Sequence, residues 1–296
     1  MPGQKFGGGW TEQKLSVLND YLGAYCQIFQ VSPRAKHFET VYVDAFAGTG
    51  LIEQRKSSAD REVLFAEFAE PETLEFLKGS ASRALQHRLT RYIFIEKSAS
   101  RIADLEKLRS ESPHKSRILI QKGDANMHLV HLVNSTDWNK CRAVVFLDPY
   151  GMQVDWETIE KLGRTKAVDL WFLFPLGQAA MRLLRKEGEP PAQWQQALDR
   201  MFGTHEWHSR FYVTTREPDF FEKEIVSTHR VADWQAVGAF MMERLKTIFH
   251  AVASNPGVLL NSRNVPLYLL CFASANPKGA PIALKIARHL LKNLKS

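Results

Sequence analysis

Short apolar runs alternate with helix-like segments along the first 180 residues. The runs are rich in β-branched and aromatic residues and are bounded by turn formers, which predicts β-strands. The expected strands cover residues 41–46, 92–96, 118–120, 143–148 and 168–174. The intervening segments have the composition of amphipathic helices, which are expected over 80–90, 98–110 and 128–133. This alternation predicts right-handed βαβ units and therefore an α/β fold built on a parallel sheet.

The two ends of the chain add elements to this alternation. Thr11 is expected to cap a first helix that carries an apolar stripe. Near the other end, apolar residues 258–260 and 267–272 predict an antiparallel hairpin that closes the sheet. A basic helix is expected to follow over 281–295.

Two segments interrupt the alternation. Residues 53–77 carry seven Asp and Glu against three Lys and Arg, which predicts an acidic insertion in the first strand-to-helix connection. Residues 182–257 are aromatic-rich and predict a mixture of helix and loop before the last strands. We predict a single domain over residues 1–296, in which the second insertion is a candidate region for target recognition or partner binding. Plain core packing of its aromatic residues is the alternative.

Composition and charge narrow the class of protein. The chain has 296 residues, of which 45% are hydrophobic and 24% charged, so disordered, collagen-like and disulfide-scaffold classes are excluded. Its formal net charge of +7 favours an anionic partner such as nucleic acid. The three cysteines are far apart, which argues against a disulfide framework and against cysteine-bound zinc. Because no apolar run could span a bilayer and no secretory signal is present, we predict a cytoplasmic protein with no membrane partner.

Acidic residues follow four successive predicted strands. They are Asp44, Glu96, Asp124 and Asp148. Ligands of open α/β sheets bind outside the carboxyl ends of the strands. One acid at such a position is common, but four in succession predict a ligand site at this edge of the sheet.

The loop after the first strand indicates which cofactor this site would bind. The sequence from Asp44 to Gly50 has two glycines for close backbone approach, but it is not the G-x-G-x-x-G of dinucleotide folds. Asp44 would repel a pyrophosphate and attract a cationic amino group, while loop N–H groups at Gly48 and Gly50 could hold a carboxylate. This match to an amino-acid head group favours S-adenosyl-L-methionine over NAD, with Phe46 lining the methionine end. A tight turn with a helix-capping Asp44 is the alternative.

Glu96 and Asp124 are assigned to the nucleoside part of the same cofactor. A carboxylate directly after an apolar strand can accept both hydroxyl groups of a ribose, which we predict for Glu96. Its alternative is an ion pair with a surface lysine such as Lys97. Asp124 is a candidate acceptor for the adenine amino group, and a role as a helix N-cap is equally compatible with its position.

The sequence Asp148-Pro149-Tyr150-Gly151 is the strongest motif. The Asp148 side chain and the Pro149 carbonyl supply two acceptors that can converge on one exocyclic NH₂ group and free its nitrogen lone pair for attack. Tyr150 offers a ring on which a flipped base can stack. These three residues are the predicted catalytic group, and a simple turn is the alternative.

Together these motifs resemble a class I S-adenosylmethionine-dependent methyltransferase that acts on an amino nitrogen. The whole chain is more closely similar to the three-Cys-motif partner family. That resemblance is carried by residues 10–15, 21–22, 44–48, 79–85, 146–151, 202–207 and 268–273. It implies a Rossmann-like methyltransferase sheet and, as a partner, a neighbouring iron–sulfur-type protein with three clustered cysteines. The cysteines of this chain are not the ones in that name.

The motif leaves the target base open. DNA adenine-N6 methyltransferases resemble D-P-P-Y at this position, and the second proline is missing here. D-P-Y-G is similar to the motif of tRNA guanine-N2 methyltransferases. The expected target is therefore adenine N6 or guanine N2, in DNA or RNA.

The sequence therefore predicts methyl transfer from S-adenosylmethionine to an exocyclic amine of a nucleic-acid base. One alternative is a cofactor-binding accessory subunit of the three-Cys partner that lacks catalysis of its own. A nucleotide-dependent enzyme that binds NAD is another.

Two weaker signals complete the sequence analysis. No metal is expected, because His128-x-x-His131 and His205-x-x-His208 lack a third ligand. Basic residues over 78–101 and 281–296 predict either a solvated face or a surface that tracks phosphates.

Overall fold

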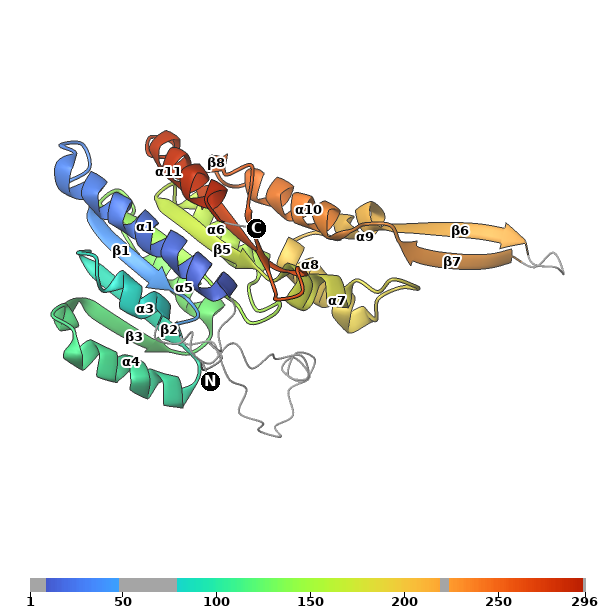
Figure 1. The fold of residues 1–296 in the computed structure, drawn as a ribbon, viewed down its shortest axis with the longest axis horizontal. Coiled ribbons are helices and arrows are strands. Elements are labelled where there is room, and N and C mark those ends of the chain that lie inside the picture. The colour runs from blue at the N-terminus through green and yellow to red at the C-terminus, as the bar shows by residue number, and fades with distance from the viewer. Residues whose placement is uncertain (1–8, 48–78, 219–223, 295–296) are drawn as a thin grey trace, which may run out of the picture.

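The computed structural model describes residues 9–47, 79–218 and 224–294 (Figure 1). Its centre is an eight-stranded sheet with the order β3-β2-β1-β4-β5-β10-β8, in which β9 also pairs with β10. The first five strands are parallel, and β10 is antiparallel to β5. The strands are β1 (Glu39–Asp44), β2 (Arg91–Glu96), β3 (Ile118–Lys122), β4 (Cys141–Leu147), β5 (Val168–Phe174), β8 (Ala251–Val252), β9 (Gly257–Leu260) and β10 (Pro266–Ser274). This arrangement confirms the predicted α/β fold with a mostly parallel sheet and a closing antiparallel hairpin.

The strand order determines where a ligand can bind. From β1 the chain moves outward to β2 and β3, then returns to the other side of β1 to form β4 and β5. The order therefore reverses between β1 and β4, and such a switch point opens a crevice at the carboxyl ends of the strands. Asp44, the last residue of β1, is in register with Phe146 of β4. The predicted acids of β1 and β4 thus border the same crevice.

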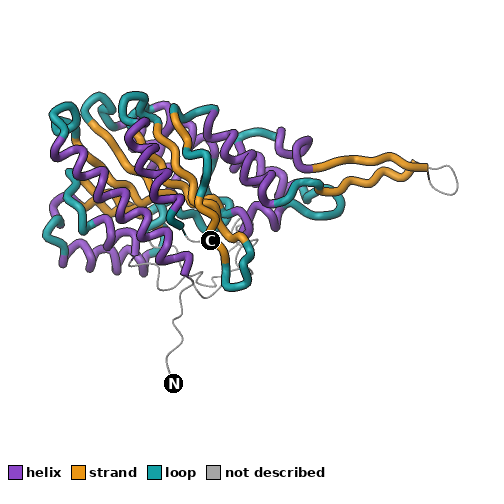
Figure 2. The backbone as a smooth tube through the Cα atoms, turned by 45° about the horizontal axis from the view of Figure 1, so that its top comes forward, coloured by secondary structure: helices purple, strands orange, loops and turns teal. Residues whose placement is uncertain are grey.

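Helices cover both faces of the sheet (Figures 1 and 2). On one face lie α1 (Gly9–Val31), α3 (Gly79–Ala84), α4 (Ala99–Glu111) and α11 (Ala280–Lys292). On the other lie α5 (Ala125–Ser135), α6 (Trp156–Arg164), α8 (Ala192–Phe202) and α10 (Trp234–Lys246). Short helical turns are η3 (Lys115–Arg117), η4 (Leu176–Ala180), α7 (Met181–Leu183) and α9 (Glu206–Phe211). Because both faces are covered, the central strands are apolar along almost their whole length, as a doubly covered sheet requires.

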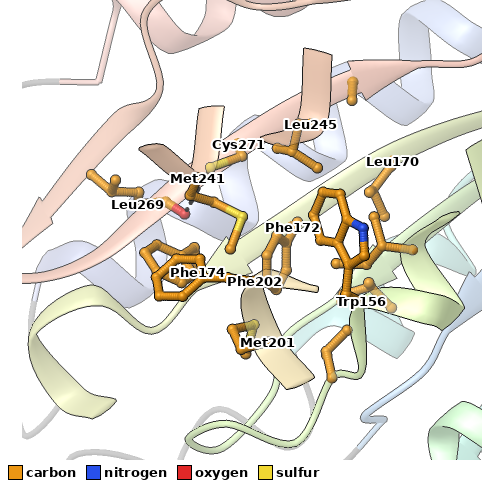
Figure 3. Close-up of a cluster of buried hydrophobic side chains, with 14 of the residues drawn as sticks. Trp156, Leu170, Phe172, Phe174, Met201, Phe202, Met241, Leu245, Leu269 and Cys271 are labelled. Carbon is orange, nitrogen blue, oxygen red and sulfur yellow. Dashed lines mark hydrogen bonds between the residues drawn. The ribbon is translucent and has the colours of Figure 1, made fainter. Parts of the chain in front are cut away.

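A cluster of aromatic and sulfur-containing side chains joins the segment after β5 to the sheet. Phe172 and Phe174 of β5 face Phe202 of α8, and the ring centroids of Phe174 and Phe202 lie 6.0 Å apart (Figure 3). Met241 of α10 packs into the same cluster. Trp207 of α9 is fully buried, so core packing accounts for at least this aromatic residue of the 182–257 segment.

The structure corrects the expectation of helix and loop throughout residues 182–257. Two antiparallel strands, β6 (Tyr212–Pro218) and β7 (Glu224–Arg230), form a ribbon that extends away from the sheet (Figure 1). Exposed β-branched residues such as Val213 and Val226 lie in both strands. The alternation of polar and apolar residues that marks a half-buried strand is absent because most of the ribbon is exposed to solvent.

Two helix boundaries also differ from the sequence prediction. Helix α1 begins at Gly9, so Thr11 lies inside the first turn and does not cap it. The helix expected over 80–90 ends at Ala84. Strands β9 and β10 form the predicted antiparallel hairpin, which joins the sheet through the pairing of β10 with β5. The predicted acidic insertion at 53–77 lies outside the described residues, and the single domain stays a prediction.

No helix in the described part of the chain combines the length and apolarity needed to cross a bilayer.

Candidate functional site

The four predicted acids lie at the carboxyl edge of four neighbouring strands. Asp44 and Glu96 are the last residues of β1 and β2, and Asp148 directly follows β4. Asp124 follows β3 after one intervening residue. Parallel pairing places all four at one edge, as the sequence predicted, because the strands end at the same level of the sheet.

Asp44 is a fully buried carboxylate. It accepts hydrogen bonds from the Tyr42 hydroxyl at 3.3 Å, from the Ser80 side chain and from the backbone N–H of Phe46. Its Oδ1 atom nevertheless has no hydrogen-bond partner among residues 9–47, 79–218 and 224–294. Burial, reinforced by the negative charge of Asp148, raises the pKa of Asp44 to about 7. A buried, under-bonded carboxylate with this pKa is prepared to accept a cationic donor.

Glu96 has one bonded and one unbonded carboxylate oxygen. Its Oε1 accepts the backbone N–H groups of Lys97 and Ser98, each at 2.7 Å. Its Oε2 is buried, has no hydrogen-bond partner in the part of the chain that the structure describes, and lies 3.7 Å from Arg101 Nη1, which is within ion-pair distance. Burial raises the pKa of Glu96, although the two N–H groups and Arg101 oppose that shift. Lys97 contacts the Glu96 carboxylate through its backbone N–H. The Oε2 atom is therefore the acceptor that a ribose hydroxyl could use.

Asp148 is held by a lysine that the sequence analysis did not single out. The Nζ atom of Lys14, on α1, lies 2.9 Å from Asp148 Oδ2, and both residues are buried, with 2% and 6% of their surface exposed. Burial lowers the pKa of Lys14, while the charges of Asp148 and Asp44 raise it. The available signal was its position: Lys14 is four residues before Leu18, on the apolar stripe of α1.

The remaining predicted site residues differ in burial and in the contacts that they make. Asp124 is exposed and caps α5 by accepting the Met127 backbone N–H at 3.1 Å, which is the alternative role considered for it. Pro149 is buried and Tyr150 is half-buried. The backbone N–H of Tyr150 donates to Gln153 Oε1 at 2.9 Å, and burial raises the pKa of its phenol. Phe46 is partly buried against the core below the loop, whereas Gly48 and Gly50 lie outside the described residues.

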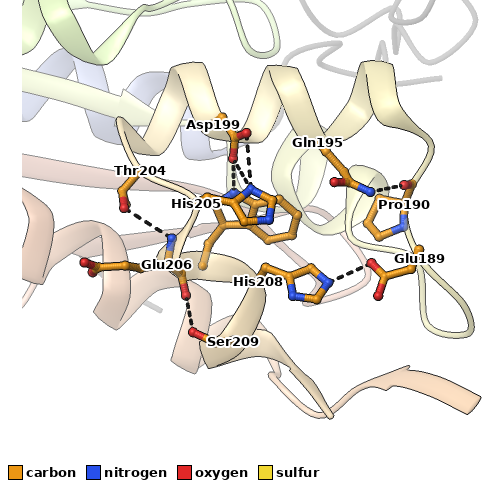
Figure 4. Close-up of polar contacts among 10 residues, drawn as sticks. Glu189, Pro190, Gln195, Asp199, Thr204, His205, Glu206, His208 and Ser209 are labelled. Atoms are coloured by element: carbon orange, nitrogen blue, oxygen red, sulfur yellow. Dashed lines mark hydrogen bonds and ion pairs between the residues drawn. The ribbon is translucent and has the colours of Figure 1, made fainter. Parts of the chain in front are cut away.

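The two histidines after α8 are bound by carboxylates. His205 Nδ1 lies 2.9 Å from Asp199 Oδ1, and His208 Nε2 lies 2.7 Å from Glu189 Oε2 (Figure 4). Their rings stack with centroids 5.5 Å apart. Within residues 9–47, 79–218 and 224–294, no group of three or more His, Cys, Asp or Glu has the arrangement of a metal site. These contacts attach α9 and the residue before it to α8 and to Glu189, which precedes α8.

Comparisons with known proteins give structural relatives only. No family model and no curated protein matches the chain. Among solved structures, a methyltransferase from Geobacter sulfurreducens is 15% identical, covering 70% of this chain and 78% of its own, with a TM-score of 0.29. The glycopeptide N-methyltransferase MtfA complexed with S-adenosyl-L-homocysteine is 13% identical, covering 93% and 89%, with a TM-score of 0.36. The N-terminal domain of EvdMO1 with S-adenosyl-L-homocysteine bound is 10% identical, covering 88% and 81%, also at 0.36. We therefore build the functional assignment on the residues of the site.

Proposed function

We propose that this protein is an S-adenosylmethionine-dependent methyltransferase whose target is an exocyclic amine of a nucleic-acid base, adenine N6 or guanine N2. The observation that carries the proposal is a pair of buried carboxylate oxygens, Asp44 Oδ1 and Glu96 Oε2, that have no hydrogen-bond partner among the described residues. Buried polar atoms of this kind are rare and call for an explanation, such as a missing ligand. They belong to adjacent strands, β1 and β2.

The chemistry of these two oxygens fits S-adenosylmethionine. Its α-ammonium group is a cationic donor suited to Asp44, and its ribose hydroxyls are neutral donors suited to Glu96. A dinucleotide fits less well, because its pyrophosphate would approach the negative charge of Asp44 at the first loop. Asp124 remains a candidate acceptor for the adenine amino group through the carboxylate oxygen that does not cap α5.

Asp148, Pro149 and Tyr150 are proposed to bind the target amine. When bound, S-adenosylmethionine would supply an electrophilic methyl group to the amine nitrogen, and the proton that this nitrogen loses would pass to solvent after the transfer. Asp148 accepts an N–H of the amine and orients its lone pair, and the Pro149 carbonyl can accept the second N–H. Tyr150 is half-buried, and its ring is proposed to stack with the target base.

A basic helix supports nucleic acid as the proposed partner. Lys285, Arg288 and Lys292 are exposed along α11, which contains no acidic residue. The helix begins after Ser274, beside the amino end of β5, and its last turn lies against Gly257 in the carboxyl half of the sheet. A nucleic acid whose phosphates bind along α11 would extend towards the acid cluster, which comprises Asp44, Glu96, Asp124 and Asp148.

Methyl-labelled S-adenosylmethionine incubated with the purified protein and separate pools of DNA, tRNA and rRNA tests the proposed function. Label in one pool would identify the class of substrate. Absence of cofactor binding in calorimetry would overturn the proposal. Cofactor binding without label in any pool would favour the second candidate described below.

A Glu96→Gln variant is expected to bind S-adenosylmethionine about tenfold more weakly. The amide removes one charge-assisted acceptor for a ribose hydroxyl, which typically contributes about 1.5–3 kcal/mol. Isothermal titration calorimetry measures the change, and Glu111→Gln, at an exposed acid on the neighbouring α4, is the matched control. Equal affinities for all three proteins would show that Glu96 does not contact the cofactor.

An Asp148→Ala variant is expected to keep cofactor affinity and to lose methyl transfer by about a hundredfold, the usual loss on removing one charge-orienting group. Calorimetry and the labelling assay separate the two effects. Unimpaired transfer would remove the role assigned to Asp148. Asp199→Ala, at a carboxylate bound to His205 away from the acid cluster, is the comparison for nonspecific damage.

The second candidate is an S-adenosylmethionine-binding accessory subunit of a three-Cys-motif iron–sulfur-type protein. It is favoured by the β6–β7 ribbon, in which Val213, Ile225 and Val226 are exposed. Arg216 and Glu224 form an ion pair across the ribbon, and the alternation of side chains places Ile225 and Val226 on opposite faces of it. Co-purification with such a partner, and loss of it on Ile225→Asp, would support this candidate.

A further inference from the structure

The ammonium group of Lys14 occupies a place beside the Asp148 carboxylate where a substrate amine would bind. Its Nζ atom donates to Asp148 Oδ2 at 2.9 Å, and its side chain reaches this point from the first half of α1. The Tyr268 ring lies beside it, with its centroid 5.9 Å from Nζ. A lysine buried this deeply is costly unless its charge is paired, so the contact with Asp148 is what stabilises it there.

An ammonium group and an amino group make the same kind of contact with a carboxylate. Both present N–H donors, and the preferred N–H···O distance is about 2.9 Å in each case. Lys14 occupies Oδ2 of Asp148, so a substrate amine that approaches this oxygen competes with Lys14 for it. We propose that Lys14 holds the place of the target amine on Asp148 and is displaced when that amine binds. This inference rests on the proposed function and adds a specificity-determining residue to it.

The helix that carries Lys14 is anchored, so the movement belongs to the side chain. The Tyr21 hydroxyl donates to Asp169 Oδ2 at 2.8 Å, and Glu12 pairs with Arg83 of α3 at 2.7 Å. Leu18 and Tyr21 are buried against the sheet. Lysine has a flexible four-carbon chain, which can withdraw its ammonium without moving the backbone of α1.

The charges around Lys14 favour a second cation. Burial lowers the pKa of Lys14, and the charges of Asp148 and Asp44 only partly oppose this shift, so two buried carboxylates act on one buried ammonium. When both acids are ionised, this group carries a net negative charge. An incoming ligand nitrogen that is a strong N–H donor, and especially a cationic one, is therefore attracted to Asp148, where Lys14 opposes it.

Two cofactor analogues test the proposal without knowledge of the substrate. Sinefungin carries an amino group on the carbon that replaces the methylsulfonium, and S-adenosylhomocysteine has no group there. The ratio of their dissociation constants therefore reports how well an amine is accommodated beside Asp148. In wild type the two affinities should be similar, because Lys14 competes with the amine.

A Lys14→Met variant should shift this ratio about ten- to hundredfold in favour of sinefungin, the range expected for a charge-assisted hydrogen bond. The double variant Lys14→Met/Asp148→Asn should return it to the wild-type value, and Lys14→Arg should leave it unchanged. Because both analogues bind the same variant, any general loss of stability cancels in the ratio. Lys36→Met, at an exposed lysine beyond the other end of α1, is the matched control.

The outcomes separate this inference from the function on which it rests. Binding of S-adenosylhomocysteine with the same ratio in wild type and Lys14→Met would overturn the displacement of Lys14 and leave the proposed function intact. Failure of S-adenosylhomocysteine to bind wild type would overturn both. A shifted ratio that persists in the double variant would show that Lys14 acts on the amine through a group other than Asp148, which also contradicts the proposal.

Discussion

An Asp44→Asn variant is expected to be more stable than wild type at pH 8 and to lose affinity for S-adenosylmethionine by about a thousandfold, the range for removing one partner of a buried charge pair. Burial raises the pKa of Asp44 from 3.8 to about 7, so the folded state binds this proton more tightly than the unfolded state. The free energy of unfolding therefore falls as the pH rises from about 4 to about 7, by at most about 4 kcal/mol for this group. Asparagine cannot ionise, so the variant avoids that cost.

The pH dependence of binding follows from the same shift. Only ionised Asp44 attracts an ammonium group fully, so wild-type affinity should rise with pH up to about 7 and then level off, by about tenfold per unit below that pH. The affinity of Asp44→Asn should be weak and nearly independent of pH in this range. Calorimetry measures binding, and urea denaturation at pH 5 and pH 8 measures stability.

Asp124→Asn is the control for the stability of Asp44→Asn. Asparagine caps a helix about as well as aspartate, so this exposed N-cap variant should keep wild-type stability. A loss of cofactor affinity in Asp124→Asn alone would support its assignment to the adenine amino group. If Asp44→Asn were instead less stable than wild type at pH 8, the buried carboxylate would be a structural group and not a destabilising site residue.

A Gly203→Ala variant is expected to lower the free energy of unfolding by about 3–5 kcal/mol, the sum of overpacking and backbone strain. Gly203 ends α8 with φ +68°, where its N–H donates to the Asp199 carbonyl at 2.7 Å. A Cβ atom there would lie 1.9 Å from Trp156 Cδ1. Trp156 is buried in the core below β5, so its ring has little room to move.

Gly188→Ala separates the two causes of this loss. Gly188 has φ +71°, almost the same backbone conformation, but a Cβ atom there would have no neighbour within 4 Å. Its loss should be only about 1 kcal/mol, from backbone strain alone. Urea denaturation of both variants gives the two values, and equal losses would show that the contact with Trp156 can be relieved.

Much of the sheet could be predicted because its signals are local. The strand at 168–174 was placed to the residue, and β1, β2 and β4 to within two residues at either end, since each is a short apolar run between turn formers. The β6–β7 ribbon was missed because its residues are exposed on both sides and show no period of two. Helix boundaries at Gly9 and Ala84 were misplaced, since the end of a helix depends on contacts as well as on capping residues.

The candidate site likewise has features that local sequence signals predict and features that depend on contacts between distant segments. Its acids could be located from the sequence, because parallel strands end at one edge and each acid follows its own strand. Two roles were left open for Asp124, a helix N-cap and an acceptor for adenine. The structure shows the N-cap, in which Asp124 accepts the backbone N–H of Met127, and the contact with adenine stays a prediction. Lys14 was not assigned a role, because its partner Asp148 is 134 residues away and no local pattern encodes that contact.

The sequence by itself determined the α/β architecture and the edge of the sheet at which its four acids lie. These follow from periodicity and from the rule that parallel strands begin and end together. Only the tertiary structure decided which charges are buried and which are paired: Asp44 with an unbonded oxygen and a pKa near 7, Glu96 with one free acceptor, and Asp148 held by Lys14. The free energy of a charge depends on the solvent and dipoles around it, and these are supplied by segments far apart in the chain.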